Sequence, residues 1–165
     1  RIGDDIIVNN MEGTVEDIQV RATYLRSPDG RRLVIPNATV YTSAITVNTA
    51  YHRRRCEFIV GIGYKDDIEL ARQTILKILD KQRTILSQPP FTVNVSALAD
   101  FSVNLQVRWW IDTKDTSTSA SISDVQMQVK EAFEQAGISM PYPIQEVSIQ
   151  RPDFPILAPT ESQTK

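Results

Sequence analysis

The densest group of potentially reactive side chains in this sequence is the run His-Arg-Arg-Arg-Cys-Glu at positions 52–57. The three guanidinium groups at positions 53–55 could bind phosphates or form salt bridges with carboxylates such as that of Glu57. Salt bridges between domains or subunits are the favoured interpretation, because Tyr51 is the only nearby aromatic residue that could stack on a nucleobase. An RNA-binding module is the alternative, and no nucleic-acid partner is expected.

No other cluster predicts a catalytic or cofactor site. His52 and Cys56 are the only histidine and the only cysteine, and without further ligands nearby they predict neither a metal site nor a catalytic pair. The run Gly-Ile-Gly at 61–63 lacks the third glycine of a dinucleotide-binding loop, so its glycines are interpreted as allowing close packing or a strand bend. The adjacent acids Asp66 and Asp67 are interpreted as caps at a helix start. A small enzyme would need a pocket of convergent polar groups, and the sequence indicates none. We therefore predict that the protein is not an enzyme and binds no cofactor.

The composition is that of a folded, nearly neutral protein. The chain has 165 residues, 41% of them hydrophobic, and its formal net charge is −2, so no global field attracts nucleic acid or anionic lipid. No apolar run reaches the ~18–20 residues that a membrane-spanning helix requires. The sequence opens Arg-Ile-Gly-Asp-Asp, with neither Met nor a signal peptide, and we expect it to be a fragment of a longer chain.

The first part of the chain, residues 1–50, is predicted to form an all-β domain. Its strand candidates are rich in Val, Ile, Thr and Tyr, and lie at 5–9, 13–26, 31–36 and 45–48. The second candidate is long enough to bend or split near residues 21–22, which makes five short strands. Turns are predicted at 10–13 and 27–30, and Asn37 is predicted to cap a helical turn at 38–41. Five short strands with one helical turn predict a small barrel.

The second part, residues 57–150, changes to a mixed pattern after a junction at 51–56. Strands are predicted at 57–64, 91–97, 101–112 and 145–150, and amphipathic helices at 67–86 and 121–136. This βαββαβ order predicts a ferredoxin-like domain with both helices on one face of the sheet. In the third strand Trp109 joins the apolar series and is predicted to be core, whereas Trp110 points outward and lies either at an interface or under a loop. Residues 151–165 are a proline-rich, polar tail.

Several short motifs occur along the chain in a fixed order. They read Gly-Thr-Val at 13–15, Asp-Gly-Arg at 29–31, Val-Ile-Pro-Asn at 34–37, Glu-Phe-Ile-Val-Gly-Ile at 57–62 and Gly-Ile-Ser-Met-Pro-Tyr-Pro at 137–143. The last motif is a helix stop followed by a rigid extended exit, because glycine suits a left-handed cap and proline fixes the backbone. In motif, order and spacing, residues 1–150 resemble the small-conductance mechanosensitive channel (MscS-like) family.

The resemblance implies an architecture and a function. It implies an Sm-like β-domain followed by an α/β domain, which together form the cytoplasmic vestibule of a channel in a bacterial inner or plastid membrane. Such channels are homoheptamers that open under membrane tension, and ions and small solutes then leave the cell through side portals. The pore helices would precede Arg1. The alternative hypothesis is an Sm-like RNA-binding protein.

The resemblance also assigns expected roles to particular residues. Portal or inter-subunit positions are expected at Arg53, Arg54, Arg55 and Glu57. A membrane-side loop is expected at Asn37 and Ala38, where the family often has glycine in place of Ala38. A C-terminal strand that joins a small parallel barrel is expected at Phe154, Ile156 and Leu157, although Pro155 interrupts it and lacks the N–H that a ladder needs.

Overall fold

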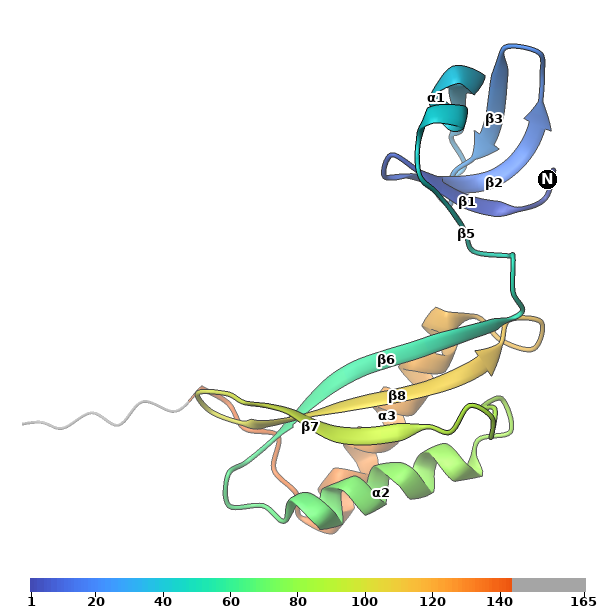
Figure 1. Cartoon of the computed structure of the whole chain (residues 1–165). Coiled ribbons are helices and arrows are strands. Elements are labelled where there is room, and N and C mark those ends of the chain that lie inside the picture. Colours follow the sequence, from blue (N-terminus) through green and yellow to red (C-terminus); the bar gives the residue numbers. More distant parts are fainter. Residues whose placement is uncertain (144–165) are drawn as a thin grey trace, which may run out of the picture.

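The computed structural model describes residues 1–143, which form two antiparallel sheets joined by a short linker (Figure 1). The first sheet contains β1 (Asp5–Val8), β2 (Met11–Ile18), β3 (Ala22–Arg26), β4 (Arg32–Pro36) and β5 (Ile45–Val47), with helix α1 (Asn37–Thr42) between the last two. Its strand order is β4-β3-β2-β1-β5. A small buried core consists of Ile6, Val8, Val15, Leu25 and Ile35. The expected five short strands and single helical turn are confirmed.

Details of this sheet differ from the sequence prediction. The long segment splits at residues 19–21 as expected, but the first turn lies at Asn9 and Asn10, both with positive φ, so β2 already begins at Met11. Gly13 therefore lies inside a strand, where an added Cβ would sit 2.7 Å from the carbonyl oxygen of Arg26. No pairing joins the edge strands β4 and β5 within residues 1–143, and α1 connects them instead.

The second sheet follows with two helices on one of its faces (Figure 1). Its elements are β6 (Arg53–Ile62), α2 (Ile68–Lys81), β7 (Thr92–Leu98), β8 (Val103–Asp112) and α3 (Thr118–Ala136). The strand order is β6-β8-β7, so the strand that follows α2 lies at the edge and β8 is central. This is the split arrangement expected for a ferredoxin-like domain. The strand predicted at 145–150 lies outside the described residues.

The core of the α/β domain is built on β8. Its side chains alternate without exception between buried and half-buried, because successive residues of a strand point to opposite faces. Trp109 is fully buried, packs edge-on against Phe58 with ring centroids 5.8 Å apart, and donates from Nε1 to Ser121 Oγ at 2.9 Å. The helices add the buried residues Ala71, Ile75 and Leu79 from α2 and Val125, Val129 and Phe133 from α3.

Helix ends follow the local sequence signals. The Asp67 carboxylate accepts hydrogen bonds from the backbone N–H groups of Glu69 at 2.8 Å and Leu70 at 3.1 Å. Ser117 caps α3 in the same way, and Gly137 ends it in the left-handed conformation with φ 69°. The expected end of the first helix at 86 is wrong: α2 stops at Lys81.

The early end of α2 and the irregularity of β7 both come from pairing with β8. Between the end of α2 and the start of β7, Ile85 bridges to Ile111 and the Leu86 N–H donates to the Trp110 carbonyl at 2.8 Å. This segment therefore extends along β8 instead of continuing the helix. In β7 only Val93 of the predicted apolar series is buried, and a bulge interrupts the register between Val95 and Ala97.

Candidate functional site: the charged start of strand β6

The arginine cluster lies within a strand and not in a junction. β6 begins at Arg53, four positions before the start predicted from the sequence. Strand geometry therefore sends the three guanidinium groups to two different faces. Arg53, Arg55 and Glu57 share the face that no helix covers, whereas Arg54 shares the helix-covered side with buried Cys56.

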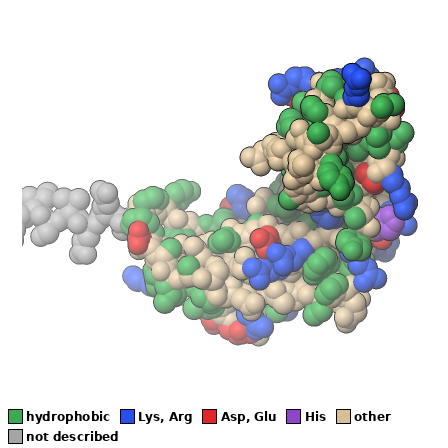
Figure 2. Space-filling model, turned by 45° about the horizontal axis from the view of Figure 1, so that its top comes forward, with side chains coloured by type: hydrophobic (Ala, Val, Ile, Leu, Met, Phe, Trp, Pro, Cys, Tyr) green, Lys and Arg blue, Asp and Glu red, His purple; other side chains and the backbone are tan. Residues whose placement is uncertain are grey.

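On the uncovered face Glu57 lies between two guanidinium groups. Its Oε2 is 3.0 Å from Arg108 Nε on the neighbouring strand and 3.5 Å from Arg55 Nη2. All three side chains are close to half exposed, so each ion pair is worth only about 0.2–1 kcal/mol. Basic and acidic side chains are interspersed over the visible surface of the α/β domain, without a large patch of one sign (Figure 2). The expected salt bridge of Glu57 thus exists, but within one sheet.

Arg54 occupies a different environment at the linker. Its Nη1 donates to the Asn48 carbonyl at 3.3 Å, which connects β6 to the segment that follows β5. It also lines a cavity of about 280 Å³ together with two carboxylates of the β-domain, Asp5 and Glu12. The other wall contains hydroxyl groups at the start of α3, including Ser117. Nothing in the local sequence pattern separates Arg54 from its two neighbours.

The linker between the sheets is held at both ends. At its start, Asn48 donates from its backbone N–H to the Asp5 carbonyl at 2.7 Å and from Nδ2 to the Asp5 carboxylate at 3.1 Å. At its end, the His52 carbonyl accepts from the N–H of Thr113 at 2.7 Å and from its hydroxyl at 3.0 Å. His52 therefore contributes its backbone here, while its side chain is exposed.

Trp110 lies beside the arginines, which the sequence did not reveal. It is the register partner of Arg55 across the β6–β8 ladder and lies half-buried on the uncovered face. An aromatic ring next to guanidinium groups is typical of interfaces, both with protein and with nucleic acid. Its neighbours Glu57 and Asp112 place negative charge on the same face, which opposes phosphate binding.

Asn37 and Ala38 lie at the start of α1, but Asn37 does not cap it. Pro36 occupies the cap position and no side chain caps the helix, so that prediction is wrong. Asn37 instead ties α1 to the β2–β3 turn: its Oδ1 accepts from Thr23 Oγ1 at 2.9 Å and its Nδ2 donates to the Gln19 carbonyl at 2.8 Å. Ala38 is exposed.

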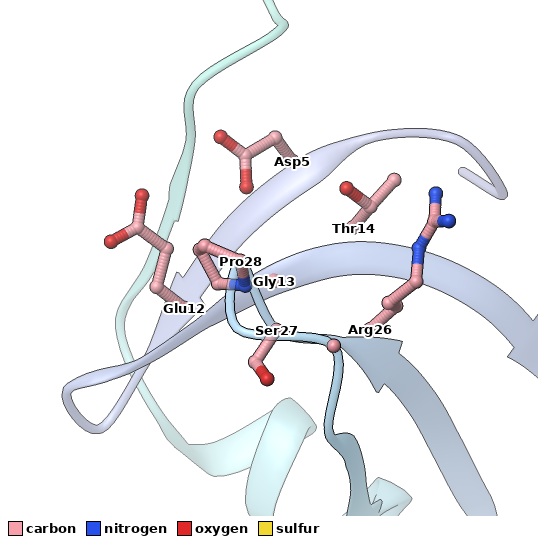
Figure 3. Close-up of a pocket in the computed structure, with 8 residues that line it drawn as sticks. Asp5, Glu12, Gly13, Thr14, Arg26, Ser27 and Pro28 are labelled. Atoms are coloured by element: carbon pink, nitrogen blue, oxygen red, sulfur yellow. The ribbon is translucent and has the colours of Figure 1, made fainter.

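A second cavity, of about 390 Å³, lies beside the turn at residues 27–30 (Figure 3). The carboxylates of Asp5 and Glu12 lie on one side of it and the guanidinium of Arg26 on the other. Arg26 also pairs with Glu16 at 3.6 Å, so its charge is already shared. Within the part of the chain that the structure describes, no group of His, Cys, Asp and Glu residues could hold a metal ion.

The remaining candidates for chemistry have structural roles. Cys56 is buried, and that burial raises the pKa of its thiol, as expected for an inert core cysteine. An added Cβ would lie 2.9 Å from Ser102 at Gly61 and 2.7 Å from Ser139 Oγ at Gly63. The interpretation of these glycines as close-packing residues is confirmed.

Asp66 forms a clamp that sequence reasoning missed. Its Oδ2 accepts from the Gly63 N–H at 3.0 Å, the Ser139 N–H at 3.0 Å and the Ser139 hydroxyl at 2.8 Å. The hydroxyl bond of Ser139, together with the two backbone bonds, lowers the pKa of Asp66 against the effect of burial. The clamp joins the turn after β6 to the exit from α3, 73 positions later.

Two further expectations concern membrane-spanning helices and the C-terminal strand. No helix within residues 1–143 is long and apolar enough to cross a bilayer. The expected C-terminal strand residues Phe154, Ile156 and Leu157 lie outside the described residues.

Both halves of the chain match families of one kind of protein. The family described as "Mechanosensitive ion channel, beta-domain" matches residues 1–49, and "Mechanosensitive ion channel MscS, C-terminal" matches residues 56–140. The chain is 37% identical over 147 residues to an uncharacterized MscS family protein of Archaeoglobus fulgidus, covering 87% of this chain and 50% of that protein. It is 30% identical over 151 residues to the small-conductance mechanosensitive channel of Helicobacter pylori, covering 92% and 55%.

Solved structures agree with these matches. The closed-state crystal structure of Helicobacter pylori MscS superposes with a TM-score of 0.87 at 30% identity, covering 92% of this chain and 60% of that one. The Arabidopsis thaliana MSL1 structure has a TM-score of 0.74 at 15% identity, over 87% of this chain and 53% of that one, and shows the shared fold alone. The chain belongs to the MscS family of mechanosensitive ion channels. It spans about half the length of the curated relatives that it matches.

Proposed function

We propose that this chain forms the cytoplasmic vestibule of a mechanosensitive channel and has no catalytic role. Seven copies would assemble beneath a membrane pore formed by helices elsewhere in a longer chain, and ions and small solutes would leave the cell on hypo-osmotic shock. The observation that carries the proposal is the ordered match of both domains to the channel family, together with the TM-score of 0.87 to a closed channel.

The two edges of the first sheet support self-assembly. Within the described residues, β4 and β5 each have one side without a strand partner, and they carry the exposed apolar residues Val34, Ile45 and Val47. An unpaired, partly apolar edge is a template for pairing with another chain. Because the two edges differ, they would pair head to tail and not as a two-fold dimer, and such pairing gives a ring when the rotation between copies closes.

The charged start of β6 supports the portal assignment. Arg53, Arg55 and Glu57 lie on a sheet face that no helix covers, next to the linker that joins the two domains. In a ring of copies, such a face would border the openings between subunits. Charged side chains at an opening bias which ions enter it.

The region around Asn37 supports the membrane-side assignment. Asn37 holds α1 against the β2–β3 turn, and both of these segments carry an exposed apolar side chain: Val20 is 96% exposed and Tyr41 is 92% exposed. We assign this surface, with Ala38 in it, to contact with the membrane helices of the longer chain.

A survival assay tests the proposed function. The longer parent protein is expressed in cells that lack their own mechanosensitive channels, and the cells are diluted abruptly into low-osmolarity medium. Rescue relative to empty vector supports osmotic release, whereas no rescue despite confirmed membrane insertion contradicts it. RNA binding by this chain that falls steeply with salt and is abolished by changing Arg53 and Arg55 would instead support the Sm-like RNA-binding module.

A further inference from the structure

The cavity beside Arg54, which we call the interdomain cavity, combines charges from both domains. It has a volume of about 280 Å³, and its lining includes Asp5 and Glu12 from the β-domain and Arg54 from β6. Hydroxyl-bearing residues at 113 and 116–118 form the wall on the side of the α/β domain. Pockets for drug-sized ligands measure about 300–1,000 Å³, so this cavity suits a smaller molecule. A ligand that contacts both the acids and the arginine bridges the two domains.

The two carboxylates of this cavity lie close together on one face of the first sheet. In the β1–β2 ladder Glu12 is the register partner of Ile7, which lies two positions after Asp5. Residues two positions apart on a strand share a face, so the two acids are diagonal neighbours about 7–8 Å apart. Figure 3 shows both carboxylates on the same side of their strands. At this separation one ammonium group can contact both carboxylates and relieve their mutual repulsion.

Within the part of the chain that the structure describes, none of these three charges forms a salt bridge. Arg54 Nη1 donates to the neutral Asn48 carbonyl at 3.3 Å, and the Asp5 carboxylate accepts from the neutral Asn48 amide at 3.1 Å. The neighbouring cavity of Figure 3 shares both acids, but its Arg26 already pairs with Glu16 at 3.6 Å. The interdomain cavity is therefore the one in which an arginine and two acids all remain available to a charged ligand.

Charges of both signs in one small cavity favour a molecule that carries both signs itself. A guanidinium binds a carboxylate through two parallel hydrogen bonds. The two acids accept hydrogen bonds and so favour a primary ammonium group, whereas quaternary ammonium groups are bound by aromatic rings. Among the described residues no aromatic side chain lines this cavity. A primary ammonium and a carboxylate on one small molecule are the groups of a free α-amino acid, and the hydroxyl-rich wall favours a polar side chain.

We propose that the interdomain cavity binds a small polar α-amino acid as a zwitterion, with its carboxylate on Arg54 and its ammonium group between Asp5 and Glu12. The three side chains are half-buried or exposed, so each ion pair is weak and the dissociation constant should be on the order of 1 mM. Bound in this way, the amino acid ties the β-domain to the α/β domain. The proposal does not depend on the channel function, because every group that it uses lies within the described chain.

Saturation-transfer difference NMR with the full chain and L-serine as the probe tests the proposal, because this method detects weakly bound ligands. Three analogues are matched controls: L-serine methyl ester lacks the carboxylate, N-acetyl-L-serine lacks the ammonium group, and glycine betaine lacks its N–H donors. We expect saturable transfer to L-serine, and binding weaker by about five-fold or more for each analogue, because each leaves a charged group of the cavity without its partner. Absence of L-serine binding, or an analogue that binds as tightly as L-serine, would overturn the proposal.

Substitutions in the same chain locate the bound amino acid. Arg54→Gln should weaken L-serine binding by about five-fold or more, because the ligand carboxylate loses its charged partner. Asp5→Asn combined with Glu12→Gln should have a similar effect, and asparagine keeps an acceptor for the Asn48 amide. Glu12→Gln alone changes an exposed side chain, so the fold is preserved, and it should weaken binding by about two-fold. Tryptophan fluorescence and circular dichroism confirm that each variant is folded.

Two other arginines provide the controls for position. Arg53→Gln changes the exposed neighbour on the opposite face of β6, and Arg26→Gln changes the arginine of the cavity that shares both acids. Each should alter L-serine binding by less than about two-fold. Equal effects of Arg54→Gln and Arg53→Gln would overturn the proposal. Loss of binding in Arg26→Gln but not in Arg54→Gln would place the ligand in the neighbouring cavity and would overturn the proposal as well.

Discussion

Replacing Asp66 tests whether a single carboxylate holds the far end of the α/β domain together. In Asp66→Ala the N–H groups of Gly63 and Ser139 lose their acceptor, along with the Ser139 hydroxyl. Hydrogen bonds to a charged group are worth about 1.5–3 kcal/mol each, and partial exposure to water reduces their sum. We expect a loss of about 2–4 kcal/mol for alanine. Asparagine keeps a neutral acceptor, and the expected loss is about 1–2 kcal/mol.

The assay is urea unfolding followed by tryptophan fluorescence. Both tryptophans, Trp109 and Trp110, lie in β8, so the signal reports the α/β domain alone. With a slope of about 1–3 kcal/mol per M, Asp66→Ala should lower the midpoint by about 1–2 M. The matched control is Asp124→Asn, an exposed acid on α3, which should change stability by less than about 0.5 kcal/mol.

The pH dependence gives an independent check on the same carboxylate. The folded state lowers the pKa of Asp66, chiefly through the Ser139 hydroxyl, so the folded chain binds a proton there less readily than the unfolded chain. Its contribution is fully present above the unfolded pKa of about 4 and is lost as the pH falls through the lower folded value. The gap between wild type and Asp66→Asn should therefore be constant from pH 7 to pH 5 and shrink below about pH 4. An Asp66→Ala midpoint equal to that of Asp124→Asn would refute the clamp.

Other parts of the structure make equally definite predictions. Ser121→Ala should destabilise the α/β domain by about 1–3 kcal/mol, because the buried Trp109 N–H loses its acceptor, and tryptophan fluorescence in urea measures this. Asn37→Ala should cost about 1–3 kcal/mol in the β-domain, measured by circular dichroism, whereas Asn37→Asp should retain the bond from the buried threonine hydroxyl. Reversing Arg53 and Arg55 to glutamate in the parent channel should shift the reversal potential toward cation preference, and an unchanged value would exclude a portal position.

Patterns that depend on neighbouring residues predicted the fold well. The alternation of β8 follows from strand geometry alone, and its buried face is the one expected, from Val103 to Ile111. The helix cap Asp67 follows from the preference of short polar side chains for exposed N–H groups at a helix start. Gly137 ends α3 because it tolerates positive φ.

Features set by contacts between distant residues could not be predicted in this way. Asp66 looked like a helix cap, because nothing local indicates a bond to Ser139, 73 positions away. Phe101 continued the apolar alternation in the sequence, but β8 starts two residues later at Val103, and Phe101 remains 42% exposed. Arg54 separates from the other arginines only once β6 is known to begin at Arg53.

The most direct measurement is patch-clamp recording of the longer parent protein in membranes from cells without their own mechanosensitive channels. If this chain is the vestibule of such a channel, suction applied to the patch should open discrete conductances that are absent from patches with empty vector. A silent patch, with the protein shown to be inserted in the membrane, would contradict the channel function and leave the family fold serving another purpose.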